Sequence, residues 1–253
     1  MPNHLTLVGL GYSPWTLKAR WSLAHCKIPH RYKDHLILVG MPELYWRLRI
    51  RAQRPSELTV PALLGDGADL TDSMAIARWA DARGGGGLFP AELFQTIQDA
   101  NVLSEKLLDH ERVRVTSAVL RDPQARYESM PKNWPRAARR VLLPMVWLGA
   151  WYLRAEFDFD TMELKRRMEE VEAGMAHFRS MGLRPERYCL GDRFTFADIA
   201  VASTIQAFSP VDTRFFRYPD ATRRAWTWDK MSLDFSPLLE WRDWIFATKG
   251  VSP

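Results

Sequence analysis

The spacing of apolar residues changes once along the chain, at a run of glycines about one third of the way along it. Before this run, short apolar segments of strand length alternate with segments whose apolar residues recur at helical spacing. We expect strands at 4–9, 32–38, 60–64 and 68–71, helices at 14–27 and 72–82, and a less regular segment at 42–50. Such alternation within so few residues indicates a small α/β domain with a mixed sheet.

The glycine run, Gly84 to Gly87, marks a boundary, because consecutive glycines are costly to hold in a helix or a strand. After it the pattern is helical throughout, and it predicts helices at 93–121, 136–156, 162–181, 196–208 and 238–246. We therefore expect a thioredoxin-like α/β domain at 1–83, a linker at 84–90 and an all-helical domain at 91–253.

One helix start in the second part is strongly marked. Thr195 and Asp198 have the spacing of a capping box, in which each residue binds the backbone N–H of the other. Phe194 and Ile199 stand at the two positions of a hydrophobic staple. Taken alone, this motif predicts only a stable helix.

Composition is that of an ordinary globular protein, with 47% hydrophobic and 26% charged residues among 253. The net charge of +5 comes from cations interspersed with acids, so we expect no nucleic-acid partner. The longest uncharged run, residues 141–153, is too short to cross a bilayer, and no signal-peptide pattern precedes it, so we expect no membrane partner.

A basic cluster at Lys132, Arg136, Arg139 and Arg140 is most simply a solvated helix face, with an anionic partner as the alternative.

The positions of the cysteines and histidines argue against a dithiol site and against a metal site. Cys26 and Cys189 are far apart and belong to no CxxC pair, which favours a reducing, cytoplasmic setting. The six histidines show no metal-ligand spacing, so we expect no metal. Ser13 and Thr16 carry hydroxyls where a dithiol motif has thiols, and Pro14 interrupts a possible dinucleotide-binding G-x-G-x-x-G.

Ser13 stands where the first predicted strand gives way to a helix. A serine followed by a proline is a good helix start, so Ser13 has a purely structural interpretation as an N-cap. The same position lies beside the positive end of a helix, where a hydroxyl can help to bind an anion. Both interpretations stay open at this point.

Four segments, in order along the chain, resemble motifs of the cytosolic glutathione transferase family, in its serine-type, bacterial-like branch. They are Tyr12 to Arg20, Thr59 to Leu63, Leu70 to Ile76 and Gly191 to Asp198. The resemblance implies a homodimeric detoxification enzyme with glutathione as co-substrate and a hydrophobic small molecule as its partner. Residues 51–58 depart from the family's pattern, which motivates the alternative of a non-catalytic module that binds a protein or a hydrophobic ligand.

The resemblance also implies roles for particular residues. Ser13 would activate the glutathione thiol, with Tyr12 as the alternative donor. The rest of the glutathione site would be Thr59, Val60, a cis peptide bond at Pro61, and Asp72 and Ser73 at the γ-glutamyl end, with Lys33 or Arg47 possible at the glycyl carboxylate. The electrophile pocket would be lined by Tyr12, Trp15 and side chains around residues 110–117, in particular His110 and Arg114.

The chemistry requires the thiolate, because a free thiol of pKa about 8.5 is mostly protonated at neutral pH. A hydroxyl that donates to a charged acceptor contributes about 1.5–3 kcal/mol, which lowers that pKa by roughly one to two units. Conjugation, dehalogenation, ether cleavage and isomerisation would all use the same thiolate, and the residues do not separate them.

Overall fold

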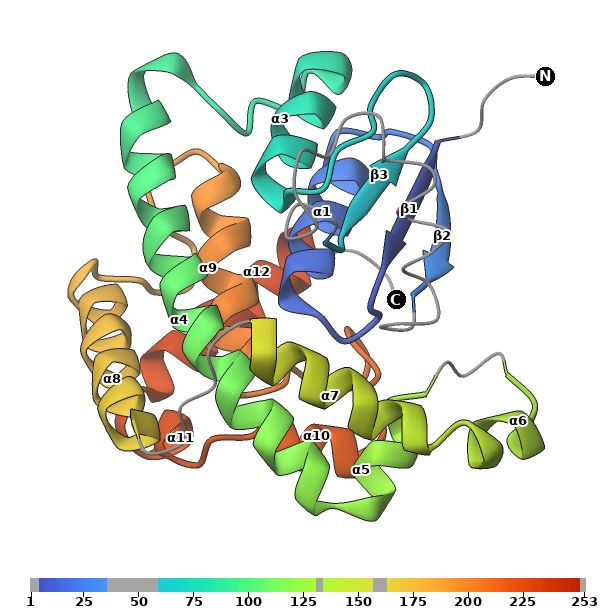
Figure 1. The fold of residues 1–253 in the computed structure, drawn as a ribbon. Coiled ribbons are helices and arrows are strands. Elements are labelled where there is room, and N and C mark those ends of the chain that lie inside the picture. The colour runs from blue at the N-terminus through green and yellow to red at the C-terminus, as the bar shows by residue number, and fades with distance from the viewer. Residues whose placement is uncertain (1–4, 36–58, 131–133, 157–162, 251–253) are drawn as a thin grey trace.

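The computed structural model describes residues 5–35, 59–130, 134–156 and 163–250 (Figure 1). Three strands form a sheet in the order β2-β1-β3, from β1 (Thr6–Gly9), β2 (Arg31–Asp34) and β3 (Ala62–Leu64). β1 pairs with β2 in parallel, with Leu7 opposite Tyr32, and with β3 antiparallel, with Leu7 opposite Leu63. The predicted mixed sheet is confirmed.

Two helices of this part, α1 (Pro14–His25) and α3 (Ser73–Gly84), lie on the face of the sheet that looks toward the helical part of the chain (Figure 1). α3 ends at a left-handed cap, because Gly85 has φ 63°. Residues 68–71 are not the predicted strand, since only Leu70 bridges to Leu63. A positive φ of 39° at Asp69 interrupts the extended run there. The predicted segment 42–50 lies outside the described residues.

The helical part has nine α-helices among the described residues, preceded by the short 3-10 helix η2 (Ala91–Leu93). They are α4 (Phe94–Arg121), α5 (Pro123–Glu128), α6 (Arg136–Val141), α7 (Pro144–Glu156), α8 (Leu164–Ser180), α9 (Phe196–Phe208), α10 (Asp220–Trp226), α11 (Lys230–Asp234) and α12 (Ser236–Lys249). The single helix expected at 136–156 is wrong. It is divided into α6 and α7 because Pro144 cannot donate the hydrogen bond that would continue α6.

α9 is the buried centre of this part, with every one of its residues shielded from solvent. The predicted capping box is present: the Asp198 carboxylate accepts from the Thr195 N–H at 2.8 Å. Its other oxygen accepts from the Cys189 N–H at 2.7 Å. The motif therefore fixes both the start of α9 and the loop before it.

α1 joins the α/β part to the helical part. Trp21 is fully buried, with its ring centroid 4.7 Å from that of Phe246, and its indole N–H donates to the Lys249 carbonyl at 2.6 Å. Because α1 is packed on both sides, the turn before it is held in place. Within the described residues, none of the helices has the length and apolar character that crossing a membrane requires.

Candidate active site

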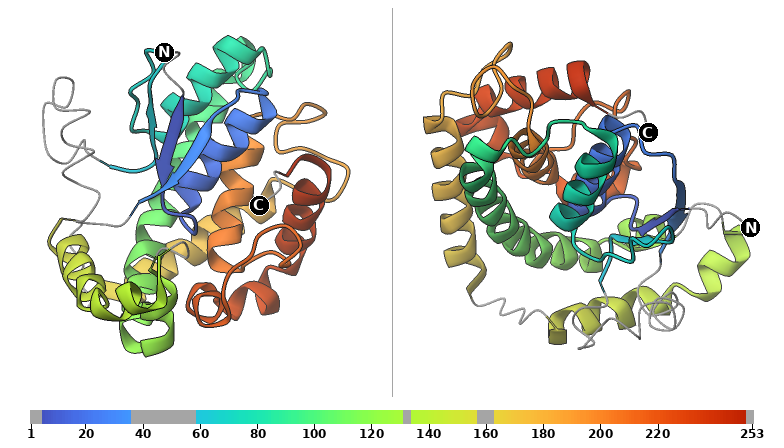
Figure 2. Two further views of the ribbon diagram at one scale, coloured as in Figure 1. Left: turned by 90° about the vertical axis from the view of Figure 1, so that its right-hand side faces the viewer. Right: turned by 90° about the horizontal axis from the view of Figure 1, so that it is seen from above.

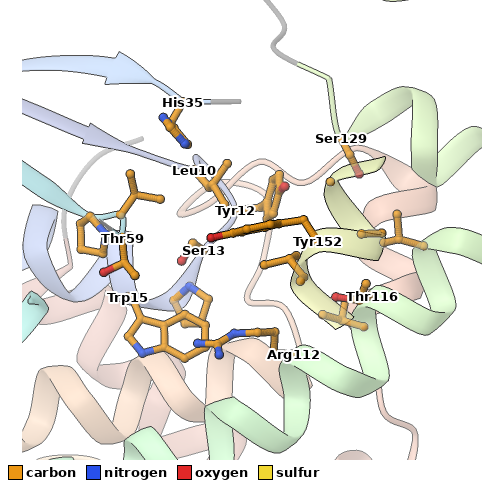
Figure 3. Close-up of a pocket in the computed structure, with 18 of the residues that line it drawn as sticks. Leu10, Tyr12, Ser13, Trp15, His35, Thr59, Arg112, Thr116, Ser129 and Tyr152 are labelled. Carbon is orange, nitrogen blue, oxygen red and sulfur yellow. The ribbon is translucent and has the colours of Figure 1, made fainter. Parts of the chain in front are cut away.

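A cavity of about 370 Å³ lies between the turn from β1 to α1 and helices α4 and α7 (Figure 3). Six of the residues predicted for the glutathione site line this cavity, together with two of the residues predicted for the electrophile. They are Tyr12, Ser13, Trp15, Thr59, Val60, Pro61, Asp72 and Ser73. Segments that are sixty residues apart in the sequence therefore meet at one place.

Ser13 occupies the N-cap position of α1, directly before Pro14, but its side chain makes no capping hydrogen bond. Its backbone is fully used, since its N–H donates to the Leu10 carbonyl and its carbonyl accepts from the Leu17 N–H, both at 2.9 Å. The residue is 7% exposed and lines the cavity. The helix-start interpretation thus explains the backbone of Ser13 and leaves its hydroxyl for another role.

The segment before α3 forms the next wall of the cavity. The peptide bond between Val60 and Pro61 is cis, as the resemblance implied. Asp72 caps α3, because its carboxylate accepts from the Ala75 N–H at 2.7 Å. The Ser73 hydroxyl is buried and has no hydrogen-bond partner among the described residues. An unsatisfied buried hydroxyl is costly, so a polar ligand in the cavity would stabilise this site.

Tyr12 lies beside Ser13, with its ring centroid 6.2 Å from that of Trp226. Burial, together with the negative charge of Asp34, raises the pKa of Tyr12 to about 12. The phenol is therefore protonated at neutral pH, and it can donate a hydrogen bond but cannot act as a base.

A buried ionic network fixes the floor of the cavity. Lys18, on α1, is fully shielded, and its ammonium lies 2.7 Å from the carboxylate of Glu105 on α4 and 3.2 Å from the Asn101 side-chain oxygen. The Trp15 indole N–H donates to the second oxygen of Glu105. The guanidinium of Arg112 lies beside the Trp15 ring (Figure 3), 4.4 Å from the centre of that ring. These contacts hold α1 against α4 and fix the Trp15 ring.

Two residues predicted for the electrophile pocket, His110 and Arg114, are not among those that line this cavity. His110 lies 3.2 Å from the Glu170 carboxylate of α8, and Arg114 forms two hydrogen bonds, of 2.7 and 2.5 Å, to Glu111. The face of α4 that lines the cavity carries Arg112, Val115, Thr116 and Val119, which follow helical spacing. The sequence indicates the helix but not which of its faces turns inward.

Two further lining residues escaped the sequence analysis. His35 directly follows β2, and Tyr152 reaches from α7 into the cavity with its hydroxyl pointing toward Ser13 (Figure 3). Lys33 does not line the cavity, while Arg47 and the segment 51–58 lie outside the described residues. No short motif marks either His35 or Tyr152.

Comparison with known families agrees with this arrangement. Residues 12–83 match the family model of the glutathione S-transferase N-terminal domain, and residues 155–243 match that of the C-terminal domain. The two models together span more than half of the chain, in the expected order. The chain belongs to the glutathione S-transferase family.

Solved structures share the fold over nearly the whole chain. The glutathione transferase GSTFuA2 of Phanerochaete chrysosporium is 15% identical with a TM-score of 0.61, and 99% of each chain is covered. A family member from Pseudomonas fluorescens pf-5, with two glutathione bound, is 15% identical with a TM-score of 0.59, covering 98% of this chain and 90% of that one. The beta-etherase LigF of Sphingobium sp. strain SYK-6 is 17% identical with a TM-score of 0.54, covering 96% and 95%. No curated protein sequence matches this chain.

Proposed function

We propose that this chain is a glutathione transferase in which the Ser13 hydroxyl donates a hydrogen bond to the glutathione thiolate, which then attacks a small hydrophobic electrophile. The observation that carries this proposal is the position of Ser13: its hydroxyl is in the cavity wall, at the N-terminus of α1, and is not used to cap that helix. The hydroxyl and the helix N-terminus both favour the anionic form of the sulfur.

The remaining groups suit the other ends of glutathione. The backbone of Val60, next to the cis bond, would pair with the cysteinyl unit. The unsatisfied Ser73 hydroxyl, at the start of α3, would donate to the γ-glutamyl carboxylate. Asp72 uses one carboxylate oxygen to cap α3, and its second oxygen would accept from the amine. We assign the glycyl carboxylate to His35, since Lys33 lies away from the cavity.

The electrophile would occupy the side of the cavity formed by Tyr12, Trp15 and the apolar faces of α4 and α7. Its apolar lining includes Val115, Val119, Met145, Val146, Leu153 and Trp226. Because Tyr12 stays protonated at neutral pH, it would donate to a polar group on the electrophile. One structural neighbour, LigF, is a beta-etherase, so ether cleavage is among the reactions to test. We also propose a cytoplasmic homodimer that acts in detoxification, on the family resemblance alone.

Three serine-to-alanine variants test the proposal. Glutathione affinity is measured by calorimetry, and turnover is measured with a panel of aryl halides, epoxides and aryl ethers. We expect Ser13→Ala to keep glutathione affinity within a few-fold and to lower kcat by roughly 100-fold, because a donor to the reacting anion is lost. Ser73→Ala should weaken glutathione binding by roughly 10-fold or more, because a hydrogen bond to a charged group is lost.

The control is Ser232→Ala, because that hydroxyl bonds only locally, to the Asp229 carbonyl at 2.8 Å. It should change neither quantity. Absence of glutathione binding at millimolar concentration would contradict the proposal and favour a binding module of the same fold. Turnover that survives Ser13→Ala undiminished would show that another group activates the thiol.

A further inference from the structure

Cations and acids are interspersed along most of the chain, but one segment carries cations without acids. Residues 129–155 contain five cations, at Lys132, Arg136, Arg139, Arg140 and Arg154, and no Asp or Glu. The formal net charge of the whole chain is also +5, so the rest of the chain is formally neutral. This segment includes both α6 and most of α7. On α6, Arg136 and Arg140 are exposed.

The same segment carries most of the exposed apolar surface. Among the described residues, seven large hydrophobic side chains are exposed, and four of them fall between positions 141 and 151. They are Val141, which is 76% exposed, Trp147 at 54%, Leu148 at 52% and Trp151 at 68%. The last three share one face of α7 by helical spacing. So dense a cluster on a short segment marks an interaction surface.

α7 therefore has two apolar faces. One lines the cavity through Val146, Gly149, Ala150 and Leu153. The other carries the exposed tryptophans and faces outward, and Figure 2 shows α6 and α7 at the outer edge of the molecule. Core packing accounts for the first face but not for the second.

We propose that α6 and the outward face of α7 form a docking surface for an anionic lipid membrane. Tryptophan and leucine enter the boundary between headgroups and acyl chains, while arginines beside them bind anionic headgroups. We expected no membrane partner because the sequence lacks a spanning segment, but a helix that lies in the interface needs none.

Charge argues against a second copy of the chain on this surface. A two-fold interface through this surface would bring α6 of one copy against the same surface of the other, and α6 carries Arg136, Arg139 and Arg140 with no acid to pair with them. A nucleic acid would match the charge but would leave the exposed Trp147, Leu148 and Trp151 without apolar partners. An anionic lipid surface matches both the charge and the apolar side chains.

The test is cosedimentation of the full chain with phosphatidylcholine vesicles, with and without phosphatidylglycerol. We expect binding only to the anionic vesicles. The variant Arg136→Gln with Arg140→Gln should lower the partition coefficient by roughly 30-fold, since each cation near an anionic surface contributes about a factor of five. Trp147→Ser with Trp151→Ser should lower it by roughly 10-fold or more, because apolar burial is lost.

Matched control variants use exposed residues elsewhere. Val102→Ser with Leu233→Ser removes side chains that are 61% and 78% exposed on α4 and α11, and it should leave binding unchanged. Arg193→Gln removes an exposed cation outside the segment and should also leave it unchanged. The proposal is overturned if the chain does not sediment with anionic vesicles, or if the controls reduce binding as much as the α6 and α7 variants do. It is also overturned if the tryptophan variant dissociates a dimer without affecting vesicles, because a second copy would then cover the surface.

Discussion

Replacing Glu105 with glutamine removes the counter-charge of a fully buried ammonium group while keeping the shape of the side chain. Lys18 has no exposed surface, and its nearest anionic oxygen is that of Glu105, at 2.7 Å. Burial lowers the pKa of Lys18, and the charge of Glu105 opposes that effect. Glu105→Gln therefore leaves a buried cation beside two neutral amide oxygens, that of the new glutamine and that of Asn101 at 3.2 Å, with no charge to compensate it.

Breaking a fully buried ion pair from one side costs about 3–5 kcal/mol. The cost here should be smaller, because the Glu105 side chain is 33% exposed and water can reach its end of the pair. We expect Glu105→Gln to lower the free energy of unfolding by about 1–3 kcal/mol. Lys18 binds its proton less tightly in the folded state than in the unfolded state, so this loss should shrink as the pH rises into the alkaline range.

Urea unfolding measures the effect, and Glu92→Gln is the matched control. Glu92 pairs with Arg193 at 3.0 Å, but both side chains are more than 60% exposed, so its loss should stay below about 1 kcal/mol. Adding Lys18→Met to Glu105→Gln should restore stability, since no buried charge remains. The reasoning is refuted if Glu105→Gln costs no more than Glu92→Gln.

Three further predictions follow from the described contacts. Asp198→Ala should lower the free energy of unfolding by about 2–4 kcal/mol, because two backbone N–H groups lose their acceptor. The control is Asp122→Ala, at the exposed start of α5, which should lower the same free energy by only about 1 kcal/mol. Equal losses in urea unfolding would contradict this. Tyr152→Phe should lower kcat by roughly 10-fold or more, with less effect on glutathione affinity, because a hydroxyl that points toward Ser13 is removed. An unchanged kcat would rule out that role. Burial raises the pKa of Cys26 to about 11, so at pH 8 the thiol is protonated and iodoacetamide should modify it far more slowly than a free thiol.

The sequence predicted best those elements that carry local signals. α9 begins and ends where expected, because Thr195 and Asp198 mark its start within four residues. α5, α10 and α11 were missed, since each has seven residues or fewer, and helices so short depend on packing against the rest of the fold.

The residues of the candidate site also fall into two groups, those that a local motif indicates and those whose position depends on helix packing. Ser13 and the cis bond at Pro61 belong to short motifs, so the sequence could indicate them. The inward face of α4 depends on how that helix docks on α1, through the contact between Lys18 and Glu105. This explains why the sequence indicated the part of α4 around His110 and Arg114 but not which of its faces lines the cavity, and why Tyr152 on α7 was missed.

If Ser13 stabilises the glutathione thiolate, the pKa of the bound glutathione thiol must depend on the Ser13 hydroxyl. The ultraviolet absorbance of the thiolate is followed as the pH is varied, for the wild-type protein and for Ser13→Ala, both saturated with glutathione. We predict a thiol pKa roughly one to two units below the free value of about 8.5 in the wild type, and a return most of the way to that value in Ser13→Ala. The same lowered pKa in both proteins would contradict the claim.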